Sequence, residues 1–499
     1  MKHIKSIYLF IYISILIAIV VFRYLILVKF SFQYADNDQT VMWNGLMDYA
    51  NGVFHEPRFY GQNYSTMLEA LFAVPLYRLG IPNYMALPIV TSFFALTPFV
   101  LISWLTYVKK NAVSGILILS IPLLLSIEYS MITAIPRGFV TGVFFASIGA
   151  VSLFYQSNKW FFIFGFLMVF AFSVNPNSVI ISIPCLAYLF FKNLKNQKFY
   201  LFVILGVGLG FAIHFWVNYF YVLNPANNIH YYELKYSLEN LTKGLNNLDS
   251  FYNWVSPIFW KNGYIYIVLS LILGVFFMIK KKVALGMFFI TIPFLLVLTT
   301  CFEKVHDGFN SVFFSKSRMY LGLPILIAIS LSFMPKINPK FLFLFLLLPI
   351  TLFIYKLTIM EESILDNVDL TRPHIVSVSS ISTIHSTCNE LNQLSKRHGV
   401  DLIIIRNYPH HETINYGCET CENDFPLTLC PGYERRTWRM FEYEQKAYST
   451  ILILGNDAGA NYPNAKEIKE HHYLIRDNKV MTFELLHSLN IDYRRFHFD

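Results

Sequence analysis

Carboxylates that could act as a general base gather in the first polar stretch of the chain, residues 34–69. Asp36 and Asp38 follow the first long apolar segment by about eight to ten residues, which places them near a membrane surface. Partial removal from water raises the pKa of a carboxyl group toward the range of a useful base. Such a base would take a proton from an acceptor hydroxyl while that oxygen attacks a sugar carbon. By spacing alone, either aspartate could instead cap a helix or end a span in water.

Positive charge for a leaving phosphate stands at the start of a later apolar segment. Lys316 and Arg318 lie there, where the phosphate of a lipid would be. Because phosphate leaves readily as an anion, this chemistry needs fixed cations rather than a general acid. Arg137 is a further candidate. Position alone also allows these arginines to be ordinary residues of the membrane interface.

Histidines offer additional candidates. His306 and Asp307 precede Arg318 and could shape an acceptor site or hold a divalent metal, a question that the sequence leaves open. The sequence predicts no other cofactor. His214 lies within an apolar segment, where a packed, hydrogen-bonded histidine is commoner than a catalyst.

Long apolar helices must position these groups. The 499 residues are 55% hydrophobic and 14% charged, whereas soluble domains carry roughly 25% charged residues. We predict a polytopic α-helical membrane protein with a C-terminal soluble α/β domain. The first apolar segment has the wrong downstream flank for a cleaved signal peptide, so we expect it to remain as an anchor. Eleven spans are predicted, near residues 7–28, 84–107, 113–130, 139–156, 161–174, 177–191, 200–222, 263–279, 283–300, 319–334 and 341–356.

The distribution of charge orients these spans. With a cytoplasmic N-terminus, the inner connections hold thirteen lysines and no acidic residue, as the positive-inside rule requires. The first loop, residues 29–83, then faces the outside of an inner membrane, as do residues 223–261, residues 301–318 and the C-terminal region. The net charge of +8 is dispersed among the inner connections, which argues against a nucleic acid as partner.

The composition changes after residue 360, because twenty of the 31 acidic residues follow it. We therefore predict a membrane region over residues 1–360 and a soluble periplasmic domain over residues 361–499. Its predicted strands are 374–378, 401–406 and 449–454, and its predicted helices are 386–398, capped by Ser386 or Thr387, and 464–471. A hairpin is predicted over 473–486, turning at Asp477–Asn478. The basic, aromatic run at 433–439 is interpreted as a solvated surface strip or, alternatively, as a contact for an anionic glycan or lipid headgroup.

Four cysteines lie in this region: Cys388, Cys418, Cys421 and Cys430. An oxidising compartment favours one or two disulfides among them. The alternatives are free thiols and a zinc site formed by Cys418 and Cys421 with Cys430 or His410.

Two short motifs resemble those of type-C (GT-C) polytopic glycosyltransferases, which are related to protein O-mannosyltransferases and aminoarabinose transferases. Residues 59–70, FYGQNYSTMLEA, resemble an FYGQ-x-Y-x-x-x-LEA signature, and residues 317–324, SRMYLGLP, resemble an Arg-x-Tyr-Leu-x-x-Pro entry to a late span. The layout of residues 1–360 is similar as well, with one span, an acidic outward loop and a bundle of helices.

The resemblance implies an enzyme that transfers a hexose or pentose from a polyprenyl-phosphate donor to a saccharide, lipid or protein acceptor, with inversion. It implies an aspartate base in the first loop, for which Asp38 is favoured over Asp36. It also implies that Gln62, Tyr64 and Glu69 shape the sugar and acceptor site, and that Arg318 meets the lipid phosphate. The aromatic residues Phe59, Tyr60 and Tyr64 could form a platform for the sugar or, equally, a belt at the membrane interface. A transporter or flippase of a lipid-linked saccharide and a non-catalytic envelope assembly protein are the alternatives.

Overall fold

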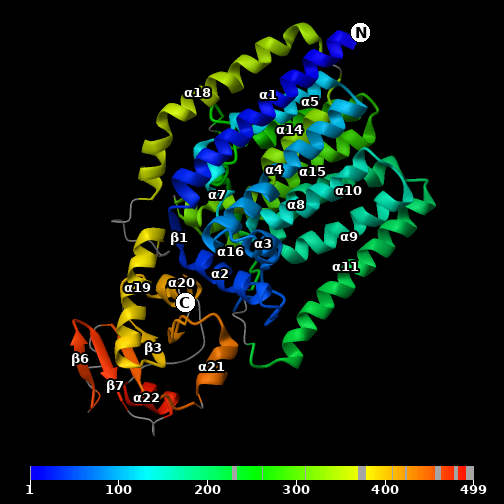
Figure 1. Ribbon diagram of the computed structural model, residues 1–499. Coiled ribbons are helices and arrows are strands. Elements are labelled where there is room, and N and C mark those ends of the chain that lie inside the picture. Colours follow the sequence, from blue (N-terminus) through cyan, green and yellow to red (C-terminus); the bar gives the residue numbers. More distant parts are fainter. Residues whose placement is uncertain are drawn as a thin grey trace. The chain divides into compact units, whose positions relative to one another are not determined.

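The computed structural model describes residues 2–227, 233–260, 262–309, 311–335, 337–368, 378–406, 408–421, 424–444, 446–455, 462, 464–476 and 481–489. The chain forms two compact units (Figure 1). Unit 1 comprises residues 1–30, 91–216 and 233–367, and unit 2 comprises residues 31–90, 217–232 and 368–499. The domain boundary at residue 360 remains a prediction. Most of the first loop belongs to the same compact unit as the C-terminal region.

Unit 1 is built from helices. They are α1 (Lys2–Ile26), α4 (Asn83–Lys109, which begins in unit 2), α5 (Ala112–Leu119), α6 (Ile121–Leu124), α7 (Ile127–Ile132), α8 (Phe139–Gly149), α9 (Asn158–Val174), α10 (Val179–Lys192), α11 (Gln197–Leu223, which ends in unit 2), α12 (Glu239–Asn246), α13 (Leu248–Tyr252), α14 (Tyr264–Ile279), α15 (Val283–Thr299), α16 (Glu303–His306), α17 (Leu323–Ser332) and α18 (Leu342–Asn367).

Among the residues that the structure describes, four helical segments are long and apolar enough to cross a membrane: Ser6–Ser31, Asn83–Lys109, Gln197–Leu223 and Pro339–Asn367. Shorter apolar helices accompany them, among them α9, α14 and α15. The chain is therefore a multi-pass membrane protein. The number of crossings and the side of each terminus remain predictions.

The span predicted at 113–130 is not one continuous helix, because the chain there forms the short helices α5, α6 and α7. Leu125 is extended, with φ −82° and ψ 159°, so the helix cannot continue through it. The carbonyl groups that the break leaves without helical partners are satisfied from elsewhere. Buried Lys356 of α18 donates to the carbonyl oxygen of Leu125 at 3.0 Å, and Ile258 donates to that of Leu124 at 3.0 Å.

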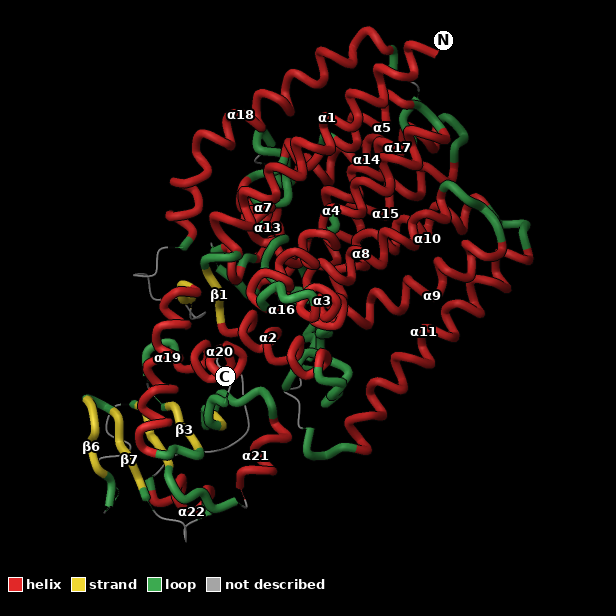
Figure 2. The backbone as a smooth tube through the Cα atoms, in the orientation of Figure 1, coloured by secondary structure: helices red, strands yellow, loops and turns green. Residues whose placement is uncertain are grey.

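Unit 2 contains every strand among the described residues (Figure 2). A five-stranded sheet has the order β4-β3-β5-β7-β6, with β3 parallel to both β4 and β5, and with β7 antiparallel to its two neighbours. Its strands are β3 (Leu402–Ile405), β4 (Leu427–Leu429), β5 (Ile451–Leu454), β6 (Lys466–Lys469) and β7 (His472–Ile475). The C-terminal helices are α19 (Ile381–His398), α20 (His411–Cys421), α21 (Thr437–Glu444) and α22 (Thr482–Ser488).

The first loop also folds within unit 2. Its elements are β1 (Tyr34–Asp36), α2 (Asn37–Ala50) and α3 (Leu68–Arg78). Strand β1 pairs antiparallel with β2 (Val378–Ser380), and α2 packs against α20. The apolar side chains of α2 that reach the core, among them Val41, Trp43 and Leu46, are fully or almost fully buried. Residues more than 300 positions apart in the sequence thus share one core.

The predicted strands at 401–406 and 449–454 are confirmed as β3 and β5. Helix α19 ends as predicted but begins earlier, with Ser380 rather than Ser386 or Thr387 as its N-cap. The helix predicted at 464–471 is wrong, since it is edge strand β6, and the hairpin predicted at 473–486 is wrong, since Thr482–Ser488 is helical. Most of the strand predicted at 374–378 and the turn at Asp477–Asn478 lie outside the described residues.

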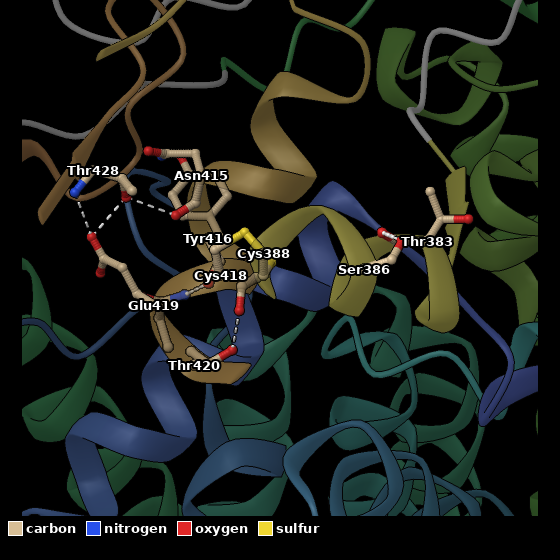
Figure 3. The surroundings of a disulfide bond; sticks show 11 residues. Thr383, Ser386, Cys388, Asn415, Tyr416, Cys418, Glu419, Thr420 and Thr428 are labelled. Carbon is tan, nitrogen blue, oxygen red and sulfur yellow. Dashed lines mark hydrogen bonds between the residues drawn. A yellow bond between two sulfur atoms is a disulfide. The ribbon is translucent and has the colours of Figure 1, made fainter. Parts of the chain in front are cut away.

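A disulfide joins Cys388 of α19 to Cys418 of α20 (Figure 3). It confirms one of the predicted bonds and removes Cys418 from the proposed zinc ligands, because a disulfide sulfur is not a thiolate. Cys430 is a buried free thiol, and the side chain of Cys421 lies outside the described residues. Burial raises the pKa of the Cys430 thiol, which keeps it protonated.

We expect the double variant Cys388→Ala/Cys418→Ala to lose about 3 kcal/mol in the free energy of unfolding of unit 2, because the bond closes a loop with a sequence separation of 30 residues. The measurement is thermal unfolding in detergent with and without reductant. Reductant should lower the melting temperature of the native protein and of a Cys430→Ala control but not that of the double variant. Equal responses of all three proteins would contradict the assignment.

Candidate active site

Asp36 is a helix cap. It is fully buried at the end of β1, and its Oδ1 accepts a hydrogen bond of 2.9 Å from the backbone N–H of Gln39. This bond satisfies a donor that the first turn of α2 cannot pair within the helix. Asp36 is therefore a helix cap, which is the alternative that its spacing allowed.

Asp38, in the first turn of α2, forms an ion pair with Nη1 of Arg435. The Asp38 side chain is 21% exposed, whereas that of Arg435 is only 3% exposed. Burial by itself lowers the pKa of Arg435, and the carboxylates of Asp38 and Glu412 more than offset it, so that the pKa of Arg435 is raised. Of the two predicted bases, Asp38 is the one whose carboxylate is accessible to solvent and beside a charged partner.

The Phe59–Tyr64 segment of the signature packs against Arg435. Gly61 has φ +72°, and a Cβ atom placed there would lie 2.8 Å from the carbonyl oxygen of Arg435. Only glycine meets both demands without strain. The Phe59 ring centroid lies 5.9 Å from the guanidinium carbon of Arg435. The signature therefore holds in place the residue that pairs with Asp38.

The other predicted site residues divide into two groups. Tyr60 and Tyr64 lie near residues 435–438: Tyr64 contributes to the raised pKa of Arg435, and the Tyr60 ring meets the Trp438 ring edge-on at 4.7 Å. The Tyr60 hydroxyl donates to Asp48 at 2.8 Å. Gln62 and Glu69 are buried, with exposed fractions of 5% and 0%, so they support the loop rather than line its surface.

The interpretation of residues 433–439 as a solvated strip is wrong. Glu434, Arg435, Arg436 and Trp438 are all buried. Arg436 donates from Nε to Glu434 at 2.7 Å, and from Nη1 to Glu419 at 2.7 Å and to Asn44 of α2 at 3.0 Å. Local sequence could not reveal this burial, because two partners of Arg436, Asn44 and Glu419, lie on α2 and α20.

The carboxylate of Glu419 accepts from two arginines. Arg439 joins Arg436 there, with Nη1 2.6 Å from Glu419 Oε1. Burial alone raises the pKa of Glu419, and the two guanidinium groups lower it to about 2. Glu419 is thus ionised at neutral pH.

Glu56 is a buried carboxyl group that the sequence did not single out. It accepts a hydrogen bond of 3.1 Å from the backbone N–H of Gly61 and is joined to the Tyr221 hydroxyl at 2.9 Å. Burial raises its pKa to about 8, against the smaller opposing effects of these two hydrogen bonds. Glu56 therefore carries a proton at neutral pH and braces the glycine turn in its neutral form.

Unit 1 holds the predicted cations. Arg318 is buried, its Nη1 donates to the carbonyl oxygens of Asp307 at 2.9 Å and Ser315 at 2.8 Å, and its Nη2 lies 3.5 Å from Asp307 Oδ2. Lys304 reaches the same carboxylate oxygen at 3.5 Å. Arg137 donates to the carbonyl oxygen of Phe313, so it belongs to the same neighbourhood. The ammonium of Lys316 lies instead 5.9 Å from the Phe251 ring centroid.

An apolar cavity of about 260 Å³ adjoins this cationic segment. Lys304 and Met319, the residue after Arg318, contribute to its lining, and most of the rest is aliphatic or aromatic. Ligand pockets typically range from about 300 to 1,000 Å³. This cavity lies just below that range, so it has room for a segment of an apolar chain. Cations beside an apolar cavity suit an amphiphilic anion.

The predicted histidines have partners in unit 1. His306 Nε2 lies 2.7 Å from the carbonyl oxygen of Thr300, and His214 Nδ1 lies 2.9 Å from the Ser173 hydroxyl. Within the described ranges, no three His, Cys, Asp or Glu side chains converge as ligands of a metal ion. A role for a divalent metal stays a prediction.

We expect Glu56→Gln to change how stability depends on pH. Since the folded pKa of about 8 lies above the ordinary value of 4.5, the native protein loses stability as pH rises between these values. The slope is about 1.4 kcal/mol per pH unit. Glutamine keeps both hydrogen bonds and cannot ionise, so the variant should gain stability relative to the native protein from pH 5 to pH 8, as measured by thermal unfolding. Parallel curves would show that Glu56 titrates normally.

We expect Arg436→Met to destabilise unit 2 by about 3–5 kcal/mol, because it leaves the buried carboxylate of Glu434 without its arginine and removes one of the two arginines bound to Glu419. Arg439→Met is the matched control, since Arg439 also binds Glu419 but its side chain is 21% exposed. Chemical denaturation should show a much smaller loss for the control. Equal losses in the two variants would contradict the structural role assigned to Arg436.

The whole chain can be compared with protein families, curated proteins and solved structures. No protein-family model matches it, and no curated protein matches it. The fold is similar to a crystal structure of ArnT from Cupriavidus metallidurans in the apo state, with a TM-score of 0.45 and 10% identity over 95% of this chain and 98% of that one. A crystal structure of the same protein bound to undecaprenyl phosphate gives a TM-score of 0.44 and 9% identity over 93% and 97% of the two chains.

Proposed function

We propose that the protein is a membrane glycosyltransferase that moves a sugar from a polyprenyl-phosphate carrier to an acceptor of the cell envelope, on the outer side of the membrane. The observation that carries the proposal is the apolar cavity of unit 1 with Lys304 in its lining, together with Arg318, which shares the Asp307 carboxylate with Lys304. A polyprenyl phosphate is an amphiphilic anion of the kind that this arrangement suits. The resemblance of residues 59–70 and 317–324 to GT-C signatures supports the same reaction class.

Asp38 is the proposed base. Its carboxylate takes the proton from the acceptor hydroxyl as that oxygen forms a bond to the anomeric carbon of the sugar. The bond between this carbon and the phosphate oxygen breaks on the opposite side, and the phosphate keeps the electron pair. Configuration at the carbon is therefore inverted. Arg318, Lys304 and Arg137 are the cations proposed to stabilise the departing lipid phosphate.

A transporter is the alternative class. Its signs would be charged groups inside the membrane that bind a substrate or a coupling ion. Arg23 of α1 and Lys356 of α18 are buried charges in long apolar helices, but both donate to backbone carbonyl groups, at 2.6 Å to Ser130 and 3.0 Å to Leu125. These contacts favour a structural role for the two cations, which supports the enzyme over the transporter.

We expect Asp38→Asn to lower sugar transfer by about 10²–10⁴-fold, because asparagine cannot accept the proton. The assay uses protein in liposomes with a panel of polyprenyl-phosphate sugars and a native envelope extract as acceptor. Asp36→Asn is the matched control, since asparagine caps a helix about as well as aspartate and should leave transfer near the native rate.

Native transfer by Asp38→Asn would remove the proposed base. Loss of transfer only in Asp36→Asn would reassign that role to Asp36. Movement of the lipid-linked sugar across the liposome membrane, with its glycosidic bond intact, would establish the transporter instead.

A further inference from the structure

We infer that Arg435, from the C-terminal region, is a positioning residue of the active site that holds Asp38 as an oriented carboxylate. This inference rests on the proposed function only in that Asp38 is the base. Neither the signature residues nor the first loop indicates a positively charged partner for Asp38. Arg435 therefore adds a residue of the C-terminal region to the site.

Geometry supports the inference first. Arg435 is almost fully buried, while the carboxylate with which it pairs is partly exposed. Burial therefore restrains the guanidinium group of Arg435, whereas part of the Asp38 side chain reaches solvent. A fixed, planar donor restricts the rotamers of its partner, as a base requires if it is to meet a hydroxyl in one orientation.

The backbone of Arg435 is positioned independently. Gly61 packs against its carbonyl oxygen, and its backbone N–H donates to the Tyr416 hydroxyl at 2.8 Å. Tyr416 belongs to α20, which packs on α2, the helix that carries Asp38. Three separate segments therefore fix the distance between the guanidinium and the base.

Electrostatics supports the inference as well. The charged and titratable groups facing Arg435 are Asp38, Glu412, Tyr416 and Tyr64. Glu412 also accepts from the side-chain amide of Asn37 at 2.8 Å, so this second carboxylate is held beside the first turn of α2. One guanidinium thus faces two carboxylates. Removal of the guanidinium would take away the positive charge that stabilises the ionised form of Asp38, which favours protonation of Asp38.

The test titrates Asp38 directly. Carbodiimide couples glycine ethyl ester to protonated carboxyl groups, and fragment mass spectrometry separates Asp38 from Asp36. In Arg435→Gln, we expect the pH midpoint of coupling at Asp38 to rise by about one unit or more. Arg439→Gln, which removes an arginine bound to Glu419, should leave the midpoint unchanged. An unmoved midpoint in folded Arg435→Gln would overturn the inference.

A second variant covers the case in which Arg435→Gln does not fold. Glu412→Gln keeps an acceptor for Asn37 and removes the carboxylate that competes for Arg435. The midpoint of Asp38 should then fall, and an unchanged or higher midpoint would overturn the inference.

The role in catalysis is measured in the liposome transfer assay. The acid limb of the plot of kcat/KM against pH should move upward in Arg435→Gln by the same amount as the coupling midpoint, while the Arg439→Gln limb stays in place. A lowered rate with an unmoved limb would make Arg435 structural only. If native protein transfers no sugar, or if Asp38→Asn is fully active, the proposed function fails, whereas the coupling experiment still decides whether Arg435 holds Asp38.

Discussion

Unit 2 depends on ion pairs between buried arginines and carboxylates from segments that are distant in the sequence. Arg436 bonds to Glu434, to Glu419 on α20 and to Asn44 on α2, and its neighbour Arg435 pairs with Asp38. A buried guanidinium is costly without such partners, and the partners are equally costly without it. The two arginines therefore require that the first loop and the C-terminal region fold together. The strand pair β1–β2 and the packing of α2 on α20 complete the same union.

The same interaction gives the site its chemical character. Asp38, in the first turn of α2, pairs with Arg435, whose backbone packs against the turn at Gly61. Glu56, a buried and neutral carboxyl group, accepts a hydrogen bond from that turn. Within the same loop, one carboxyl group is thereby paired with a cation and another is kept protonated by burial. Unit 1 contributes a different environment, an apolar cavity bordered by Lys304 with Arg318 close by.

Sequence reasoning predicted what depends on composition and local pattern. Apolar runs revealed the long helices, and the clustering of acidic residues pointed to the loop that contains Asp38. It failed where a distant partner decides. Arg435 and Arg436 sit in a run that looks solvated, and only Asp38, Glu419 and Asn44, remote in sequence, explain their burial. Residues 464–471 are predicted as a helix, yet pairing with β7 makes Lys466–Lys469 the charged edge strand of a sheet. Glu56 carried no local signal, since its neutrality comes from burial.

A double-mutant cycle on Asp38→Asn and Arg435→Gln measures most directly whether the first loop and the C-terminal region meet at the proposed base. The free energies of unfolding of the native protein, both single variants and the double variant give the coupling between the two side chains. Our account predicts a favourable coupling of about 1–3 kcal/mol at neutral pH, falling as Asp38 becomes protonated in acid. Additive effects within about 0.3 kcal/mol would show that the two residues do not interact, and would contradict the account.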